Sequence, residues 1–389
     1  MVFPNSPTDH GPDGFEPAWA ERARSLAERV VRPTAAGRDR AGRWDHALFA
    51  ELAADRPGPG LAGPLVPRAL GGTGLSAAQT CALLEGLGEG ARDPGFALAV
   101  GAHSVLATVP IRAFGSAGQR ERYLPRMASG EWLGSVSLHQ TRGAAADPAV
   151  AARPAGDGSG GWVLGGDLDL VVGAPVAHHF LVVAGHHGGR TAFLVDATTP
   201  GLRIAEAGPE AMPTCSWGRL VLDDCALPQE AVLGTVGGAP DEVEPLLAAL
   251  DWVFTSAPWL GLLRALTRDA LDGARDRRLF GRPLTHSQSA RFALADLATQ
   301  CELAAGLLYR AAAQFDAGRP SLADAAAVRL FVASAARAVT EGAARLAGPP
   351  SATGDRLIER THRDALFFAE TGGVDVLHPV IAASVLELG

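Results

Sequence analysis

Apolar positions follow two different periods along the chain, and the period changes twice. From Pro17 to about Gly130, segments such as AWAERARSLAERVV and SAAQTCALLEGLGEGA have helical spacing and are separated by Gly and Pro clusters. Between about Trp132 and Leu233, short β-branched runs such as HHFLVVAG and TAFLVD are bounded by Gly, Pro or Asp, which is typical of strands. Long helical periods return from about Asp241. The pattern predicts a helical region, a β region and a bundle of long helices.

These changes predict the domain organisation and the fold class. We expect a flexible N-terminus over 1–16, a helical domain over 17–131, a β domain over 132–240 and a helical bundle over 241–389. The first segment is rich in Pro, Gly and Asp, which favours disorder. The fold class is therefore α+β, mainly α. A chain of 389 residues is long enough to form two or three cores within one compact unit.

Composition and charge exclude several function classes. The chain is 47% hydrophobic and 20% charged, as in ordinary globular proteins. Its net charge of −8 argues against a nucleic-acid partner, which would require a basic surface. All 34 basic residues are arginine, because the sequence contains no lysine. Catalysis through a lysine Schiff base or a lysine general base is thereby excluded.

The pattern also predicts neither a membrane segment nor a metal centre. We find no apolar run long enough to span a bilayer, and the N-terminus lacks the basic-then-apolar order of a signal peptide. A cytoplasmic protein without a membrane partner is expected. The histidine pairs at 178–179 and 186–187 flank a predicted strand without nearby carboxylates, so no metal site is expected. Four scattered cysteines predict buried thiols: Cys81, Cys215, Cys225 and Cys301.

Several phrases, in order along roughly residues 18–383, resemble acyl-CoA dehydrogenases. They are VPRALGGTGLS (Val66–Ser76), FGSAGQRERYLPRMASGEWLGSVSL (Phe114–Leu138), DDCALPQEAVLG (Asp223–Gly234), RRLFGRPLTHSQSARFALADL (Arg277–Leu297) and IERTHRDA (Ile358–Ala365). The resemblance implies an N-terminal helical domain, a middle β-barrel-like domain and a C-terminal four-helix bundle. It also implies dimers or tetramers with FAD at the subunit interfaces.

The resemblance further implies a reaction and its partners. In this family a carboxylate removes the α-proton of an acyl thioester while hydride passes from the β-carbon to the flavin. An α C–H is a weak acid, so the step requires hydrogen bonds to the thioester oxygen and a closely held base. The expected partners are an acyl-CoA or an acyl-carrier protein. The expected assembly is a homodimer, a homotetramer or a heteromer with a related subunit.

Two carboxylates are candidates for the catalytic base. Aligning RDA (363–365) with the family without a gap puts Gly372 where the usual glutamate stands, and Glu370 falls two residues early, about 3 Å along a helix. Some family members carry the base on the first long helix of the bundle. Counting back from LFG (279–281) places Asp251 at that position. Asp251 is therefore the preferred base, Glu370 is the alternative, and the neighbouring Trp252 is a candidate substrate contact.

The chain departs from the family where it would hold its own flavin. The stretch HQTRGAAAD (139–147) replaces the family's glycine- and serine-containing loop, with Leu138 and Gly143 as remaining candidate contacts. At the flavin face, Leu170 stands in place of an aromatic residue and Val172 in place of a threonine that bonds to the ring. Each lost hydrogen bond costs about 1 kcal/mol or more. These changes predict that FAD is bound weakly, shared or lost.

Residues that reach a neighbouring subunit's FAD in the family are better kept. Arg277 matches the arginine that meets the pyrophosphate, Phe280 an adjacent ring contact, and Gln288 a further contact, while RLAGPP keeps Gly348 of a longer phrase. Three hypotheses follow. The chain is an acyl-CoA dehydrogenase-like enzyme, a non-catalytic subunit that shares the FAD site of a heteromer, or a flavin-free enzyme or acyl-carrier-binding protein on the same fold.

Overall fold

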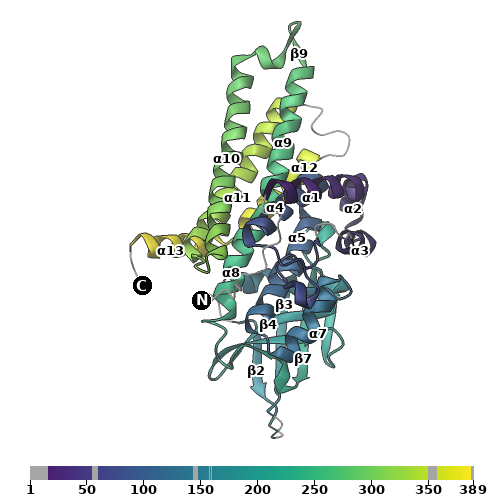
Figure 1. Cartoon of the computed structure of the whole chain (residues 1–389), viewed down its shortest axis with the longest axis vertical. Coiled ribbons are helices and arrows are strands. Elements are labelled where there is room, and N and C mark those ends of the chain that lie inside the picture. The colour runs from purple at the N-terminus through teal and green to yellow at the C-terminus, as the bar shows by residue number, and fades with distance from the viewer. Residues whose placement is uncertain are drawn as a thin grey trace.

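The computed structural model describes residues 16–54, 60–142, 148–156, 158, 160–348 and 357–386. Gly143 therefore lies outside the described residues. Figure 1 shows a β-rich lower half and a long helical upper half, with most of the N-terminal helices between them and α7 beside the strands. The N-terminal helices are α1 (Glu16–Val30), α2 (Ala35–Ala41), α3 (His46–Ala54), α4 (Ala77–Ala91), α5 (Pro94–Gly101), α6 (Thr108–Phe114) and α7 (Ala117–Ala128).

Local sequence signals begin several of these helices. Both α4 and α7 start with a capping box, in which a serine side chain and a glutamine three residues later bond each other's backbone N–H. The pairs are Ser76 with Gln79 and Ser116 with Gln119. A π-helical stretch, η3 (Ala102–Ala107), joins α5 to α6.

The middle of the chain forms one sheet with its own core. Its strands are β1 (Gly134–Val136), β2 (Val150–Pro154), β3 (Trp162–Val171), β4 (His179–His186), β5 (Gly189–Asp196), β6 (Leu202–Glu206), β7 (Gly218–Leu227) and β8 (Val232–Leu233). They lie in the order β6-β7-β3-β2-β4-β5-β8, with β1 paired to β4. Trp162, Phe180, Phe193 and Leu220 are buried in this core. Strands β2, β3, β4 and β7 mark the lower half of Figure 1.

The rest of the chain is a bundle of long helices. These are α8 (Val243–Phe254), α9 (Ser256–Asp276), α10 (Gln288–Asp316), α11 (Leu322–Ala347), α12 (Leu357–Thr371) and α13 (Val374–Val385). A small hairpin of β9 (Arg278–Leu279) and β10 (Arg282–Pro283) connects α9 to α10. In Figure 1 this hairpin is at the end of the bundle farthest from the sheet.

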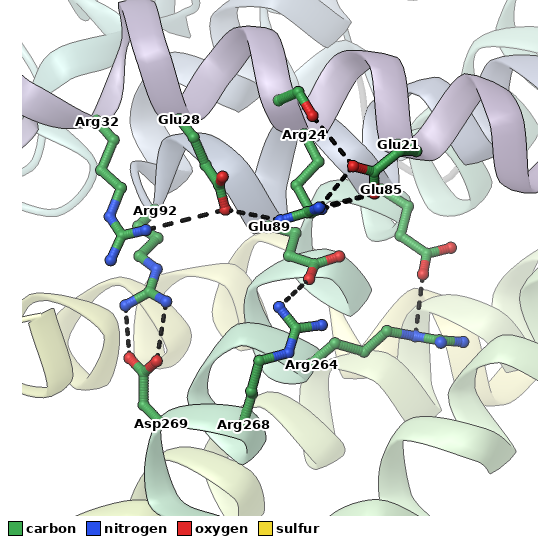
Figure 2. A network of polar contacts seen from close by, with 11 residues as sticks. Glu21, Arg24, Glu28, Arg32, Glu85, Glu89, Arg92, Arg264, Arg268 and Asp269 are labelled. Atoms are coloured by element: carbon green, nitrogen blue, oxygen red, sulfur yellow. Dashed lines mark hydrogen bonds and ion pairs between the residues drawn. The ribbon is translucent and has the colours of Figure 1, made fainter. Parts of the chain in front are cut away.

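Helix α4 fastens the N-terminal helices to the bundle through α9. Gly261 allows close approach, since a Cβ built there would lie 1.9 Å from the carbonyl oxygen of Glu85. Beside this contact, Glu85 meets Arg264 at 2.9 Å and Glu89 meets Arg268 at 2.5 Å. Figure 2 shows these pairs with a third, Arg92–Asp269, which also connects the end of α4 to α9, whereas the ion pairs of Arg24 stay within α1. Partly buried pairs of this kind fix the relative position of the helices.

Two helical stretches in the described ranges are long and apolar enough to cross a membrane, Pro94–Phe114 and Val243–Asp276. The prediction that no apolar run reaches this length was therefore wrong. Buried polar residues such as Asp251 and Ser256 break up the run of apolar letters in the second stretch. Its average hydropathy is nevertheless high enough for a membrane span. In each stretch, the apolar 18-residue window is 100% buried inside the protein. A bent pair, Leu357–Thr371 with Asp375–Val385, passes only when counted together.

Candidate active site

Asp251 lies inside the protein, near the end of α8. Its side chain is almost fully buried, with the residue 3% exposed, and its Oδ2 accepts a hydrogen bond of 2.8 Å from Oγ1 of Thr141. Thr141 ends the 3-10 helix η4 (Leu138–Thr141), which follows β1 in the β half. In the described part of the chain, Asp251 forms no ion pair. The geometry therefore brings a lone carboxylate to the junction of the bundle and the β half.

A buried arginine is close to this carboxylate. Arg329, on α11, is 2% exposed, and its Nη1 donates to Oγ1 of Thr255, one turn after Asp251. Its Nη2 donates to the carbonyl of Phe368 and to Oγ1 of Thr371. Burial lowers the pKa of Arg329 to about 10, and the charge of Asp251 opposes that shift. Arg329 therefore stays protonated at neutral pH and contributes a fixed positive charge.

The alternative base, Glu370, has a different environment. It lies in the last turn of α12 with an exposed side chain, whereas Asp251 is buried. At the position where the family's usual glutamate is expected, Gly372 is buried against Arg329, and a Cβ there would lie 2.9 Å from Nε. A closely held base needs a site shielded from water. The burial favours Asp251 over Glu370.

Trp252 follows Asp251 on α8 and is one of the largest fully buried side chains, 1% exposed. It belongs to the core that joins the N-terminal helices to the bundle. Such burial gives the indole a packing role. Its role as a substrate contact stays a prediction.

The predicted flavin face of this chain is apolar, and the backbone N–H and carbonyl of Val172 already form hydrogen bonds within the protein. Leu138 and Val172 are both buried. The N–H of Val172 donates to the carbonyl of Val136, and its carbonyl accepts a hydrogen bond from the Ser135 hydroxyl. This face therefore offers packing against a flat ring, but the described residues provide it with few free donors.

Leu170, beside that face, has an unusual backbone conformation. Its φ is +50°, and the pairing of β3 with β7 shifts register between Leu168 and Val171. Bulges that re-aim side chains are frequent next to active sites, and a left-handed conformation is unfavourable for a leucine. The register shift at Leu170 therefore changes the direction of the side chains next to the predicted flavin face.

The residues expected to serve a neighbouring subunit's cofactor gather at the far end of the bundle. Arg277 donates to the carbonyls of Leu346 and Ala347 at 3.2 Å each, at the end of α11. A Cβ on Gly348 would lie 2.7 Å from Nη1 of Arg277. Phe280, at the tip of the hairpin, is 97% exposed. Gln288 is the first residue of α10 and is also exposed. An exposed arginine and an exposed ring therefore lie at the same end of the bundle.

The two halves of the predicted cofactor site are far apart within one chain. Helix α9 separates them, and its 21 residues span about 30 Å. In Figure 1 the hairpin lies at the top, whereas β3 and β4 lie in the lower half. One FAD is therefore not expected to contact both predicted halves within the same chain.

Other histidines near the junction have structural roles. His103, on η3, is buried, its Nδ1 accepts from the N–H of Gly134, and its Nε2 lies 3.1 Å from the carbonyl of Met127. Burial lowers the pKa of His103 to about 4. His179 is also buried, and burial lowers its pKa to about 3. Both imidazoles are therefore neutral at physiological pH. Within the described ranges, no group of His, Cys, Asp and Glu is arranged to hold a metal ion.

Thr141 and Arg329 were not predicted from the sequence. Thr141 is inside the phrase HQTRGAAAD, which signals a changed cofactor loop but not a partner for Asp251. Arg329 interrupts the apolar run AAAVRLFVASAA, and a charge in such a run is a signal of a paired or functional group. The Nε atoms of Arg329 and Arg142 are both buried and donate to no partner in the described structure.

Comparison with known proteins identifies the family of this chain. The model of the acyl-CoA dehydrogenase N-terminal domain matches residues 16–131, and that of the C-terminal domain matches residues 253–386. Benzylmalonyl-CoA dehydrogenase of Aromatoleum aromaticum is 31% identical over 371 residues, which cover 93% of this chain and 95% of that protein. L-prolyl-(peptidyl-carrier protein) dehydrogenase of Pseudomonas fluorescens is 28% identical, covering 83% of this chain and 87% of that protein.

Solved structures agree with the fold. The structure of PigA with FAD and proline has a TM-score of 0.88 and 25% identity, and the match covers 98% of this chain and 100% of that chain. Butyryl-CoA dehydrogenase from Megasphaera elsdenii has a TM-score of 0.85 and 25% identity, over 97% of this chain and 100% of that chain. From its domains, its relatives and its architecture, the chain belongs to the acyl-CoA dehydrogenase family.

Proposed function

We propose that this chain is an acyl-CoA dehydrogenase-type flavoenzyme that acts on the α,β C–C bond of an acyl thioester, carried by CoA or by a carrier protein. The observation that carries the proposal is the buried Asp251 carboxylate, held by Thr141 at the junction of the bundle and the β half. Relatives that act on CoA thioesters and on a carrier-protein substrate support this substrate class.

In the proposed mechanism, Asp251 takes the proton from the α-carbon. The hydrogen bond from Thr141 fixes the orientation of the carboxylate, and burial excludes water that would compete for the proton. FAD, when bound, supplies the hydride acceptor for the β-carbon. Leu138 and Val172 would pack against its ring system. Arg277 and Phe280 of a second subunit would hold its pyrophosphate and an adjacent ring.

The FAD proposal rests on the exposed group at the hairpin and on a relative solved with FAD. The apolar flavin face predicts that FAD is held less tightly than in a site with a hydroxyl donor, and that it is shared between subunits. An absorption spectrum of the isolated protein, followed by titration with FAD, measures this directly. We expect a flavin band that grows with added FAD. A protein that stays colourless at saturating FAD would contradict the redox proposal and leave a flavin-free function.

The base is tested by exchange at the α-carbon. Asp251→Asn keeps the shape of the side chain but removes its basicity, so it should lower deuterium exchange into an acyl-CoA at least 100-fold. Glu370→Gln is the matched control and should exchange at the wild-type rate. The opposite pattern would transfer the role of base to Glu370.

A second candidate function is that of a partner subunit in a heteromer. The observation in its favour is the asymmetry between the apolar flavin face and the exposed group of Arg277, Phe280 and Gln288. Co-expression with a related family member distinguishes the two. A yellow complex in which Asp251→Asn leaves full activity would support the partner role, whereas loss of activity would support the enzyme.

A further inference from the structure

Arg329 is buried, and all of its hydrogen-bond acceptors are neutral. Its guanidinium donates to Oγ1 of Thr255, to the carbonyl of Phe368 and to Oγ1 of Thr371. Within the described ranges it forms no ion pair. At the position expected for the family's usual glutamate, Gly372 packs against it, and a Cβ there would lie 2.9 Å from Nε. A buried charge is costly without an opposite charge, so the nearby carboxylates decide what this arginine does.

Thr255 links Arg329 to the proposed base. Its hydroxyl accepts a hydrogen bond of 3.0 Å from Nη1 of Arg329 and donates one of 2.5 Å to the backbone carbonyl of Asp251. A hydroxyl can accept and donate at the same time, so both bonds form together. The charge of Asp251 also opposes the lowering of the arginine's pKa by burial. The guanidinium and the carboxylate therefore interact electrostatically without direct contact.

Thr255 lies at the break between two helices. Helix α8 ends at Phe254, and α9 begins at Ser256. Pro258 has no N–H, so it cannot donate to the carbonyl of Phe254 four residues earlier, and the helical hydrogen bonds are interrupted here. Asp251 is in the last turn of α8, where a cation is favourable because of the helix dipole. The direction of its side chain therefore depends on the geometry of this break.

Other charged groups also surround α8. The 3-10 helix η4 carries His139, whose pKa is lowered by burial, and is followed by Arg142, whose charge acts against that of Arg329. Arg329 differs from Arg142 because it is linked to Asp251 through Thr255. On the other elements that pack against α8, charged or titratable groups bond elsewhere, among them His103 on η3, Glu85 on α4, Arg112 on α6, Arg264 on α9 and Asp316 on α10.

We propose that Arg329 is a positioning residue for Asp251, which holds the break between α8 and α9 through Thr255 and supplies the positive charge that balances the carboxylate. This inference rests on the proposed function. The guanidinium does not touch the substrate and acts only through Asp251. A purely structural role, in which Arg329 only ties α12 to α11 through Phe368 and Thr371, would change the stability of the protein but not the pH dependence of its reaction.

The pH profile of α-proton exchange separates these two roles. Deuterium exchange into butyryl-CoA by the FAD-loaded protein is measured from pH 5 to pH 9. Removal of a neighbouring positive charge favours the protonated form of a carboxyl group, so the profile of Arg329→Gln should move to higher pH. Relative to wild type, this variant should lose about tenfold more rate at pH 5 than at its alkaline plateau. A profile with the wild-type midpoint would overturn the proposal.

Two conservative variants separate the charge from the link through Thr255. Arg329→Lys keeps the charge but cannot form the same three hydrogen bonds, so it should keep the wild-type midpoint with a lower plateau. Thr255→Val keeps the arginine and removes the hydroxyl, so it should also lower the plateau without moving the midpoint. A midpoint that moves as far in Arg329→Lys as in Arg329→Gln, or a wild-type rate in Thr255→Val, would contradict the proposal.

Arg337→Gln is the matched control for the change in charge. It removes an exposed arginine from the same helix, α11, and should retain the wild-type profile. A shift as large as that of Arg329→Gln would mean that long-range electrostatics sets the profile, and would overturn the role of Arg329.

The pairing is also tested without catalysis. Denaturant unfolding at pH 7 is compared for wild type, Asp251→Asn, Arg329→Gln and the double variant. If the two charges balance each other, Arg329→Gln should raise the unfolding constant about fivefold less in the Asp251→Asn background than in wild type. Additive effects would overturn the proposal. If wild type exchanges no α-proton, the proposed function fails, whereas coupling in this cycle would still support Arg329 as the partner of a buried carboxylate.

Discussion

At the scale of single residues, burial lowers the pKa values of His103 and His179 and keeps these two imidazoles neutral at physiological pH. His103 is buried and linked to Met127 and Gly134, whereas Asp251 is buried with one hydroxyl donor. A neutral imidazole satisfies both of its hydrogen bonds without a charge. The histidine therefore stabilises the junction of η3 with β1, and the carboxylate remains available for chemistry.

The histidine gives stability a defined pH dependence. The pKa of His103 falls from 6.5 to about 4 in the folded protein, so between these values the unfolded chain takes up a proton that the folded protein excludes. Its contribution is fully present above pH 6.5 and is lost as the pH falls towards 4. The loss is roughly 3 kcal/mol, at about 1.4 kcal/mol per unit. Denaturant unfolding of wild type and His103→Gln from pH 8 to pH 4 measures it.

His103→Gln keeps one polar contact and does not titrate. Its free energy of unfolding should therefore fall less steeply than that of wild type below pH 6.5, and the two profiles should converge. Profiles that stay parallel over the whole range would show that His103 is not the group responsible.

The sequence predicted Asp251 but not its surroundings. Asp251 was singled out by counting back along consecutive residues from a recognisable phrase, so the distance involved is local in the sequence. Its donor, Thr141, is 110 positions away, and Arg329 is 74 positions from Thr255. Contacts of this kind depend on how α8, α11 and η4 pack, and no spacing in the chain reports them.

At the scale of elements, the contact of α4 with α9 joins the N-terminal helices to the bundle. The two helices approach closely at Gly261, beside the Glu85–Arg264 pair shown in Figure 2. Backbone at this distance leaves no room for a methyl group. The position of η3 depends on this contact, because α4 is followed directly by α5 and then by η3.

Gly261→Ala should therefore destabilise the protein by about 2–3 kcal/mol or more, because a Cβ would overlap the Glu85 carbonyl and force α4 away. Gly273→Ala is the control on the same helix. No atom lies within 4 Å of a Cβ built there, so alanine should stabilise the helix by about 0.5–1 kcal/mol. Chemical denaturation measures both. Equal effects would contradict the packing argument.

The helices and strands themselves were largely predictable. The helical spacing of apolar residues and the β-branched runs are local signals, and they predicted the order of helical, β and helical segments. The π-helical turn at η3 and the positive φ of Leu170 were not predicted, since tertiary packing imposes them. The length of the apolar helical stretches was underestimated from the sequence, because polar residues such as Asp251 interrupt the apolar runs.

At the scale of the whole molecule, the two predicted halves of the cofactor site lie at opposite ends of the chain's fold. The hairpin with Phe280 is at the far end of the bundle, and the flavin face is in the β half, as Figure 1 shows. The resemblance to the family implied that FAD sites are shared between subunits. The length of α9, which separates the two predicted groups of FAD contacts, gives a physical reason for that expectation. The Phe280 ring is 97% exposed, so it is accessible to a second molecule.

Phe280→Ala should therefore weaken FAD binding at least tenfold while leaving the unfolding transition of the subunit unchanged, because the side chain has no packing to lose within its own chain. FAD titration and size-exclusion chromatography measure binding and assembly. Phe292→Ala, another exposed ring farther along α10, is the control and should retain FAD affinity. A large loss of subunit stability in Phe280→Ala would contradict this assignment.

The separation of the half-sites has a genetic consequence. In a mixed dimer of one copy defective at Arg277 and another defective at the Val172 face, both defects fall in the same site, and the other site is intact. When the two inactive alleles are expressed together, each mixed dimer should therefore have about half of the activity of a wild-type dimer. Two alleles with defects at the same end should restore none.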